Sequence, residues 1–181
     1  MNVQVKYTYQ DLLTTPEDGN RYEIFEGELV MTPSPNDAHQ TAHSNLFGML
    51  WSFVKMHSLG KLYSTPFDVY FDEGTVVEPD ILFVSKDRLH IIDGGKVNGA
   101  PDFVVETISE STESRDRTFK FKRYAQEGVK EYWIVDPSKK TIEIHELKET
   151  GFVLAGKFGD KDQIHSPYFT GFTFSANGAF E

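Results

Sequence analysis

The stretch VVEPDILFV at residues 76–84 and the stretch APDFVVETI at residues 100–108 decide how this chain folds. Both runs have the length and the β-branched or aromatic content of strands that are buried in a core. Each also carries a carboxylate, which is costly to bury unless it is paired, hydrogen-bonded or bound to a metal. A basic amphipathic segment, SRDRTFKFKRY at residues 114–124, follows. Two buried carboxylates followed by a lysine on a helix predict a metal site with a basic side chain that assists it.

The two carboxylates of interest are Asp80 and Glu106, which we expect on neighbouring strands of one sheet. Magnesium prefers a few carboxylate oxygens and keeps several water molecules. Such an ion polarises a phosphate and lowers the pKa of an attacking water. Pro79 cannot donate a hydrogen bond to a sheet, so it suits a strand that diverges there and opens a cleft. The alternative is that both carboxylates only cap backbone groups or form salt bridges.

Length and composition limit the classes of protein that this chain can represent. Its 181 residues are expected to form one domain, residues 1–181, large enough to bury a core. Cysteine is absent, which excludes disulfides and thiolate metal sites. No apolar run approaches the roughly 20 residues of a membrane-spanning helix, and the first residues lack the pattern of a signal peptide. A cytoplasmic location without a membrane partner is the default expectation.

The net charge of −10 argues against a protein that coats nucleic acid through its overall charge. Residues 115–130 are different, because they hold six basic and two acidic residues, a local charge of +4. Beyond about 10 Å at moderate salt the distant acidic groups are largely screened. A basic helix on an acidic body can therefore meet phosphates, although the same run also fits an ordinary solvated helix face.

The pattern of the whole chain predicts a mixed α/β fold, a central sheet flanked by helices, with a β-hairpin near the N-terminus. A capping box predicts a short helix from Thr8, and Asn36 or Asp37 can cap a long helix that runs to about Ser58. Trp51 and Trp133 are expected in the core. The other expected elements are a hairpin of 21–25 and 28–32 around Glu26-Gly27, strands within 61–71, a helical turn at 86–92, a loop at 94–99, a helix ending at Gly128, and strands at 131–135, 141–147, 152–158 and 169–174.

The order of Pro79-Asp80, Glu106 and Lys120 resembles the core of the PD-(D/E)XK nucleases. More narrowly, the chain resembles the putative restriction endonuclease family, through motifs that cover most of residues 20–145. The resemblance implies a restriction-endonuclease-like core and a magnesium-dependent DNA endonuclease, with manganese as a possible substitute. It also implies that Asp80, Glu106 and the backbone carbonyl of Thr107 hold the metal. The matching motifs are 22–29, 33–39, 78–80, 101–106, 116–124 and 131–137.

The sequence departs from the superfamily pattern at the lysine expected two residues after the acidic residue. Position 108 shares the face of Glu106 on a strand, yet it holds Ile108. Asp116, Lys120 and Tyr124 lie four apart along one face of the following helix, and Lys120 is the position that matches the family. Its ammonium is expected to orient the water or to neutralise charge on the phosphate, with Asp116 fixing it. Tyr124 is interpreted as packing, and Lys120→Ala is expected to leave the fold and metal binding nearly intact.

Two further residues are candidates for catalysis. Glu28 follows the turn glycine in a motif shared with the family, and His39 lies in the first turn of the long helix. Related nucleases often place an acidic or polar residue near the metal on the helix before the core sheet. His39 can equally satisfy a hydrogen bond at the helix end. His43, one turn later, has a spacing to His39 that is typical of zinc sites, but without the HExxH pattern this signal is poor.

The leading interpretation is a metal-dependent DNA endonuclease that acts as a homodimer, since cutting both strands needs two sites related by twofold symmetry. The alternative is a catalytically inactive nucleic-acid-binding or scaffolding protein that keeps the nuclease fold. A metal-dependent hydrolase of another phosphate ester is a third class, for which no specific residue speaks.

Overall fold

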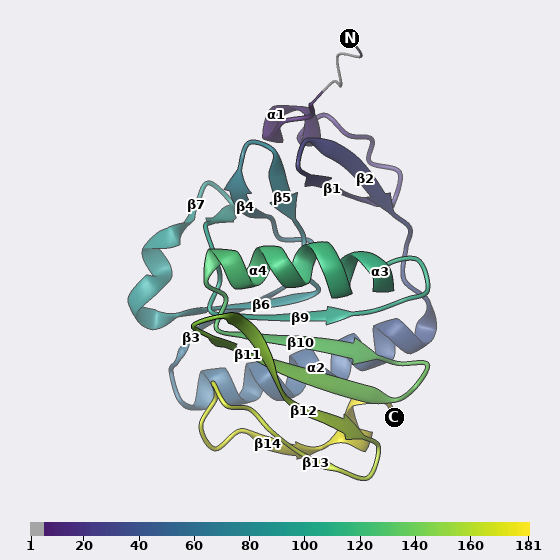
Figure 1. Ribbon diagram of the computed structural model, residues 1–181, viewed down its shortest axis with the longest axis vertical. Coiled ribbons are helices and arrows are strands. Elements are labelled where there is room, and N and C mark those ends of the chain that lie inside the picture. Colours follow the sequence, from purple (N-terminus) through teal and green to yellow (C-terminus); the bar gives the residue numbers. More distant parts are fainter. Residues whose placement is uncertain (1–5) are drawn as a thin grey trace.

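The computed structural model describes residues 6–181. Two six-stranded sheets form its framework, and a two-stranded sheet of β13 (Gln163–His165) and β14 (Thr173–Ser175) lies near the C-terminus (Figure 1). In spatial order, the central sheet consists of β12 (Gly151–Gly159), β11 (Thr141–Lys148), β10 (Glu131–Asp136), β9 (Phe103–Thr107), β6 (Ile81–Ser85) and β3 (Gly60–Ser64). The second sheet consists of β2 (Glu28–Thr32), β1 (Arg21–Phe25), β5 (Thr75–Val77), β4 (Val69–Asp72), β8 (Lys96–Asn98) and β7 (Ile92–Asp93).

The central sheet is mixed, because β9 and β10 pair in parallel whereas the other neighbours are antiparallel. Helical segments connect β9 to β10, as a parallel crossover requires. They are α3 (Glu113–Arg115), the π-helical turn η2 (Asp116–Lys120) and α4 (Phe121–Glu127). The predicted mixed α/β class with helices on the sheet is confirmed.

Successive residues of the buried strands face opposite layers. Phe103 and Val105 belong to a core with α2 (Asp37–Met56), whose buried residues Ala42, Leu46, Leu50 and Val54 follow helical spacing. Val104 belongs to a second core that contains Tyr124 of α4 and parts of the second sheet. The central sheet is therefore covered on both faces, with α2 on one and α4 on the other.

The C-terminal segment completes the α2 side of the core. Phe169, Phe172 and the short 3-10 helix η3 (Ala176–Ala179) pack there. Glu131 of β10 is fully buried and holds this segment, because its carboxylate accepts hydrogen bonds from Ser166 Oγ and the Tyr168 backbone N–H, each at 2.7 Å, and from Trp133 Nε1. A carboxylate on the central sheet thus fixes a loop that lies more than 30 residues later in the sequence.

The run at residues 76–84 is not one strand, as its apolar content predicted, but two. β5 ends at Val77 in the second sheet and β6 begins at Ile81 in the central sheet. Between them, Pro79 has no N–H for a ladder and restricts the residue before it. The N–H of Glu78 donates to Glu23 Oε1 at 2.9 Å instead of to a neighbouring strand. Asp80 consequently lies where the chain passes from one sheet to the other.

Helix ends follow the sequence signals closely. Thr8 and Asp11 form the expected capping box of α1 (Tyr9–Leu12), and the Asn36 side chain accepts from the His39 N–H at the start of α2. Gly128 ends α4 with φ of +92°. The segment 113–127 differs from the regular α-helix expected, because the turn η2 is π-helical. None of the described helices combines the length and apolar character needed to cross a membrane.

Several sequence-based expectations were wrong in detail. The expected loop at 94–99 contains strand β8, which pairs with β7 and β4. The expected strand at 169–174 is mainly a turn, because Phe169 and Phe172 point into the core between β13 and β14. Trp133 is fully buried as expected, but Trp51 is 47% exposed on the outer face of α2. The helical turn expected at 86–92 is confirmed, as the 3-10 segment η1 (Lys86–Ile91).

Candidate active site

Asp80 and Glu106 face each other where β6 and β9 part. The two strands pair antiparallel with Ile81 opposite Val105, so continuing the register by one residue places Asp80 opposite Glu106. Residues that are opposite on antiparallel strands point to the same face. Here that face is the α4 side, and both residues are nearly inaccessible to solvent. The structure therefore brings together the two carboxylates that the sequence singled out.

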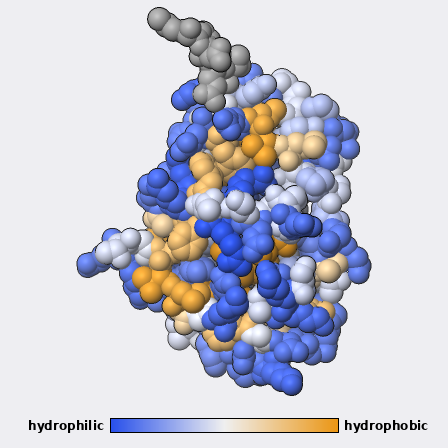
Figure 2. All heavy atoms as spheres, turned by 45° about the vertical axis from the view of Figure 1, so that its right-hand side comes forward, coloured by the Kyte–Doolittle hydropathy of each residue, from blue (hydrophilic) through white to orange (hydrophobic). Residues whose placement is uncertain are grey.

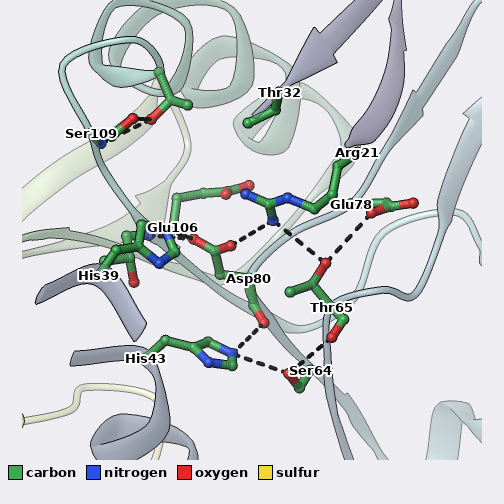
Figure 3. Close-up of polar contacts among 12 residues, drawn as sticks. Arg21, Thr32, His39, His43, Ser64, Thr65, Glu78, Asp80, Glu106 and Ser109 are labelled. Atoms are coloured by element: carbon green, nitrogen blue, oxygen red, sulfur yellow. Dashed lines mark hydrogen bonds and ion pairs between the residues drawn. The ribbon is translucent and has the colours of Figure 1, made fainter. Parts of the chain in front are cut away.

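Asp80 is surrounded by hydrogen-bond donors (Figure 3). Its Oδ1 accepts from Arg21 Nη1 at 2.8 Å, and its Oδ2 accepts from the Thr107 backbone N–H at 2.8 Å. His39 Nε2 lies 3.3 Å from Oδ2. Burial opposes the charge of Asp80, but His39, Arg21 and the Thr107 N–H together hold its pKa well below the usual range. Asp80 is therefore ionised throughout the physiological pH range.

Glu106 is bound from the helical side of the sheet. Its Oε1 accepts from Lys120 Nζ at 2.8 Å and from the Tyr124 hydroxyl at 2.7 Å. The same ammonium lies 2.9 Å from Glu23 Oε1 and 3.8 Å from Asp116 Oδ1. The expected Asp116–Lys120 pair is present, but both side chains are buried in the protein interior. Tyr124 packs in the core and also donates to Glu106, so packing is only part of its contribution.

The cluster carries more buried carboxylates than lysines, and this shifts its pKa values. Burial raises the pKa of Glu106 to about 8, and the charges of Asp116, Asp80 and Glu23 act in the same direction. Burial opposes the charge of Lys120, but Glu106, Glu23 and Asp116 raise its pKa above the ordinary value. Near neutral pH the cluster therefore retains a proton on Glu106 in addition to those of Lys120. An additional cation at this place would be stabilised.

The other basic residues of the helical segment are engaged within the protein. Arg115 donates to Thr32 and lies 3.5 Å from Glu23, and Arg117 binds Glu143 with Nη1 at 2.8 Å. Arg117 also contacts Glu113, and Arg123 contacts Asp72 and Glu127. Each of these arginines is paired with a neighbouring carboxylate, which favours an ordinary helix face over a surface that offers its charge to phosphates.

The remaining candidates are placed differently. The ring of His39 contacts Asp80, while its backbone N–H is the one that Asn36 caps. His43 does not join His39 in a pair, because its Nε2 lies 3.1 Å from both the Asp80 carbonyl oxygen and Ser64 Oγ. Glu28 is exposed at the turn end of the hairpin and lines a separate hollow with residues of the 72–75 turn. It does not join the Asp80 cluster in the structure, and Glu23 is the hairpin carboxylate that does.

Two hollows open beside Asp80 and share Arg21, Pro35 and His39. One, of about 420 Å³, is lined by hydroxyl and amide side chains that include Thr32, Ser34, Asn36 and the 109–112 loop. The other, of about 520 Å³, reaches Asp80 itself. The edge where β9 ends and α2 begins comes forward in Figure 2, which shows a hydrophilic band across the middle of this face, with hydrophobic patches above and below. Solvent and a polar ligand can thus approach the buried carboxylates from this side.

The model of a family described as "Putative restriction endonuclease" (Uma2) matches residues 8–177. The chain belongs to this family. Among solved structures, it is similar to one described as a putative nuclease belonging to DUF820 from Anabaena variabilis, with a TM-score of 0.78 and 20% sequence identity over 96% of this chain and 97% of that chain. At this identity the similarity shows a shared nuclease-like fold. Among curated proteins, none matches the chain.

In this member of the putative restriction endonuclease family, sequence reasoning missed Arg21 and Glu23. Both lie on β1, where Tyr22, Ile24 and Phe25 surround them and make the strand read as an ordinary hairpin strand. A signal was available, because Glu23 is a charged residue between Tyr22 and Ile24 of a short strand and is as costly to bury as Asp80. What the sequence could not reveal is that the second sheet folds over the central one at the cluster.

Proposed function

We propose that the chain is a metal-dependent nuclease that hydrolyses phosphodiester bonds of DNA at Asp80 and Glu106. One observation carries the proposal: two buried carboxylates oppose each other where two strands part, next to a polar hollow, with Lys120 Nζ 2.8 Å from Glu106. Membership of the family and the nuclease-like fold support the same chemistry.

The donor set fits a hard divalent cation such as magnesium, with manganese as a substitute. Within residues 6–181 no group of three or more His, Asp or Glu side chains forms a ready-made metal site. Magnesium needs fewer, because it binds through one or two carboxylates and keeps its waters. Asp80, Glu106 and the Thr107 carbonyl are the residues that would hold it, and the pKa of Glu106 is raised first by burial and also by the charges of Asp116, Asp80 and Glu23, which a cation would offset. When bound, the ion polarises the phosphate and activates a water.

The protein's own residues position these groups. Lys120 and Tyr124 both donate to Glu106 Oε1 and fix the orientation of its carboxylate. The Thr107 N–H and His39 do the same for Asp80 Oδ2. Lys120 also adds a permanent positive charge beside the site, which stabilises negative charge that develops on a phosphate. His43, bound to the Asp80 carbonyl, holds the backbone at the point where β6 begins.

A catalytically inactive, nucleic-acid-binding or scaffolding protein is the second candidate. It is favoured by the internal pairing of the site: Arg21 is paired with Asp80, Lys120 is bound to Glu106, and the arginines of the helical segment are paired with acids. Such a site is stable without a metal and offers little free positive charge to DNA.

Cleavage of supercoiled plasmid DNA in magnesium and in manganese distinguishes the two candidates. Asp80→Asn and Glu106→Gln should abolish cleavage. Asp102→Asn is the matched control, because Asp102 also follows a proline and is buried, yet it binds Arg88 and the Ser85 N–H instead. Cleavage that persists in Asp80→Asn, or is absent from the wild type with both metals, would contradict the catalytic proposal.

A further inference from the structure

Arg21 occupies a special place in the cluster. It begins strand β1, and its guanidinium reaches from the second sheet to the seam between β6 and β9 (Figure 3). Nη1 lies 2.8 Å from Asp80 Oδ1 and 3.5 Å from Thr65 Oγ1. Its Nε has no hydrogen-bond partner among the described residues although it is buried. The guanidinium therefore uses only part of its five N–H donors.

The contacts of Asp80 are unequal on its two oxygens. Oδ2 is held by the Thr107 N–H, which belongs to the central sheet, and by His39, which belongs to α2. Oδ1 is bound by Arg21, a residue of the other sheet. A divalent ion that binds Asp80 through Oδ1 would lie beside Arg21 Nη1, a positive charge 2.8 Å from the same oxygen. The two cations repel each other at this distance, so Arg21 and an ion compete for Asp80.

Arg21 also lines both hollows beside the site. One hollow contains Asp80, Glu78 and Thr65, and the other contains hydroxyl groups of Thr32, Ser34 and the 109–112 loop. About one-fifth of the Arg21 side chain is exposed. The side chain already lines the hydroxyl-lined hollow, where Glu110 is the one acidic residue among the described residues of the lining.

We propose that Arg21 is a displaceable counter-ion, which neutralises Asp80 in the metal-free protein and moves to a substrate phosphate when a divalent ion takes its place. The planar guanidinium binds phosphate oxygens through two parallel hydrogen bonds. The ligand of the hydroxyl-lined hollow is accordingly a backbone phosphate of the nucleic acid. This inference rests on the proposed function, since it presumes that Asp80 binds a metal.

The two halves of this exchange predict effects of opposite sign for Arg21→Gln. Without the competing guanidinium, manganese should bind about 10-fold more tightly, equivalent to about 1.4 kcal/mol. Without the phosphate ligand, DNA should bind about 10-fold more weakly, and the dependence of its affinity on salt should decrease by about one unit of slope. Simple damage to the fold would weaken both.

Manganese binding is measured by the loss of the free-ion signal in electron paramagnetic resonance. DNA binding is measured by fluorescence anisotropy of a labelled duplex in calcium. The matched control is Arg88→Gln, because Arg88 also binds a buried aspartate, Asp102, at 2.9 Å but lies outside the site. Arg88→Gln should leave both affinities unchanged. If Arg21→Gln does not fold without metal, the manganese-dependent rise in its melting temperature, compared with that of wild type, gives the same comparison of metal affinity.

Three outcomes overturn the inference, and they differ in what else they affect. If manganese binds wild type and Arg21→Gln equally, Arg21 is not a competitor and the proposed metal site stands. If manganese binding strengthens but DNA binding is unchanged, Arg21 does not move to a phosphate. If neither protein binds manganese, the metal site of the proposed function fails together with the inference.

Discussion

Replacing Lys120 by methionine tests how much the cluster depends on one ammonium. The side chain is 3% exposed and lies 2.8 Å from Glu106 and 2.9 Å from Glu23. Removing one partner of a buried ion pair typically costs about 3–5 kcal/mol, because the other charge stays buried and unpaired. That is a large share of the roughly 5–15 kcal/mol that stabilises most proteins. The sequence alone led us to expect a nearly intact fold for Lys120→Ala, and these contacts reverse that expectation.

The loss should be visible as a lower melting temperature. For a chain of this size each kcal/mol corresponds to roughly 2–4 °C, so Lys120→Met should melt about 6–20 °C below wild type at pH 7.5. The pKa of Lys120 is raised, so its contribution is fully present below its ordinary pKa and is lost only at very alkaline pH. The deficit should therefore be similar at pH 5.5 and at pH 7.5.

Differential scanning calorimetry of the metal-free protein gives this comparison. Lys122→Met is the control on the same helix, because Lys122 is exposed and has no ion pair among the described contacts. It should melt within about 2 °C of wild type. A Lys120→Met variant that melts like the control would show that the ammonium is not needed to hold the carboxylates. In that case its effect on cleavage, expected to be at least ~100-fold, would report directly on catalysis.

Further predictions concern the pH dependence, the metal and the assembly. Burial raises the pKa of Glu106 from 4.5 to about 8, so its contribution to stability is lost as pH rises between these values, and Glu106→Gln should flatten the unfolding free energy measured in urea from pH 5 to pH 8. Manganese affinity should increase with pH up to about 8, since binding displaces the proton of Glu106; calorimetry in buffers of different ionisation enthalpy would show no released proton if this is wrong. Tyr124→Phe should lower cleavage and leave the core packed, as judged by near-ultraviolet circular dichroism, because only the hydrogen bond to Glu106 is removed. A twofold dimer should appear in sedimentation at micromolar concentration, and a monomer both with and without DNA would exclude it.

Much of the fold could be predicted because its local signals agree with the tertiary structure. Asn36 caps α2, Gly128 ends α4, and the 21–25 and 28–32 strands pair around Glu26 and Gly27, both of which adopt positive φ. The division of residues 76–84 between two sheets could not be predicted from periodicity. Its cause is Pro79 together with Glu23. The Glu23 carboxylate accepts a hydrogen bond from the Glu78 N–H, although Glu23 lies 55 residues earlier in the sequence.

The site could be predicted only in part. Asp80, Glu106 and Lys120 stand out because charges in apolar runs need partners, and they do lie together. The spacing argument for Lys120 assumed a regular α-helix, whereas η2 is π-helical and buries Lys120 together with Asp116. Arg21 and Glu23 come from the second sheet, and no local pattern reports how two sheets meet. Glu28 was chosen from the same hairpin for its motif, but only the residues near the open end of that hairpin reach Asp80.

The bond between Glu131 and the C-terminal segment has a consequence for synthesis of the protein on the ribosome. Helix α2 and strand β10 are synthesised before residues 163–180, yet these later residues supply two of the three donors to the Glu131 carboxylate and part of the α2 core. A released chain that ends near residue 160 would therefore expose apolar surface and a carboxylate without its Ser166 and Tyr168 donors. The core on the α2 side closes only after residues 163–180 have emerged, so α2 keeps an uncovered apolar face for much of the synthesis.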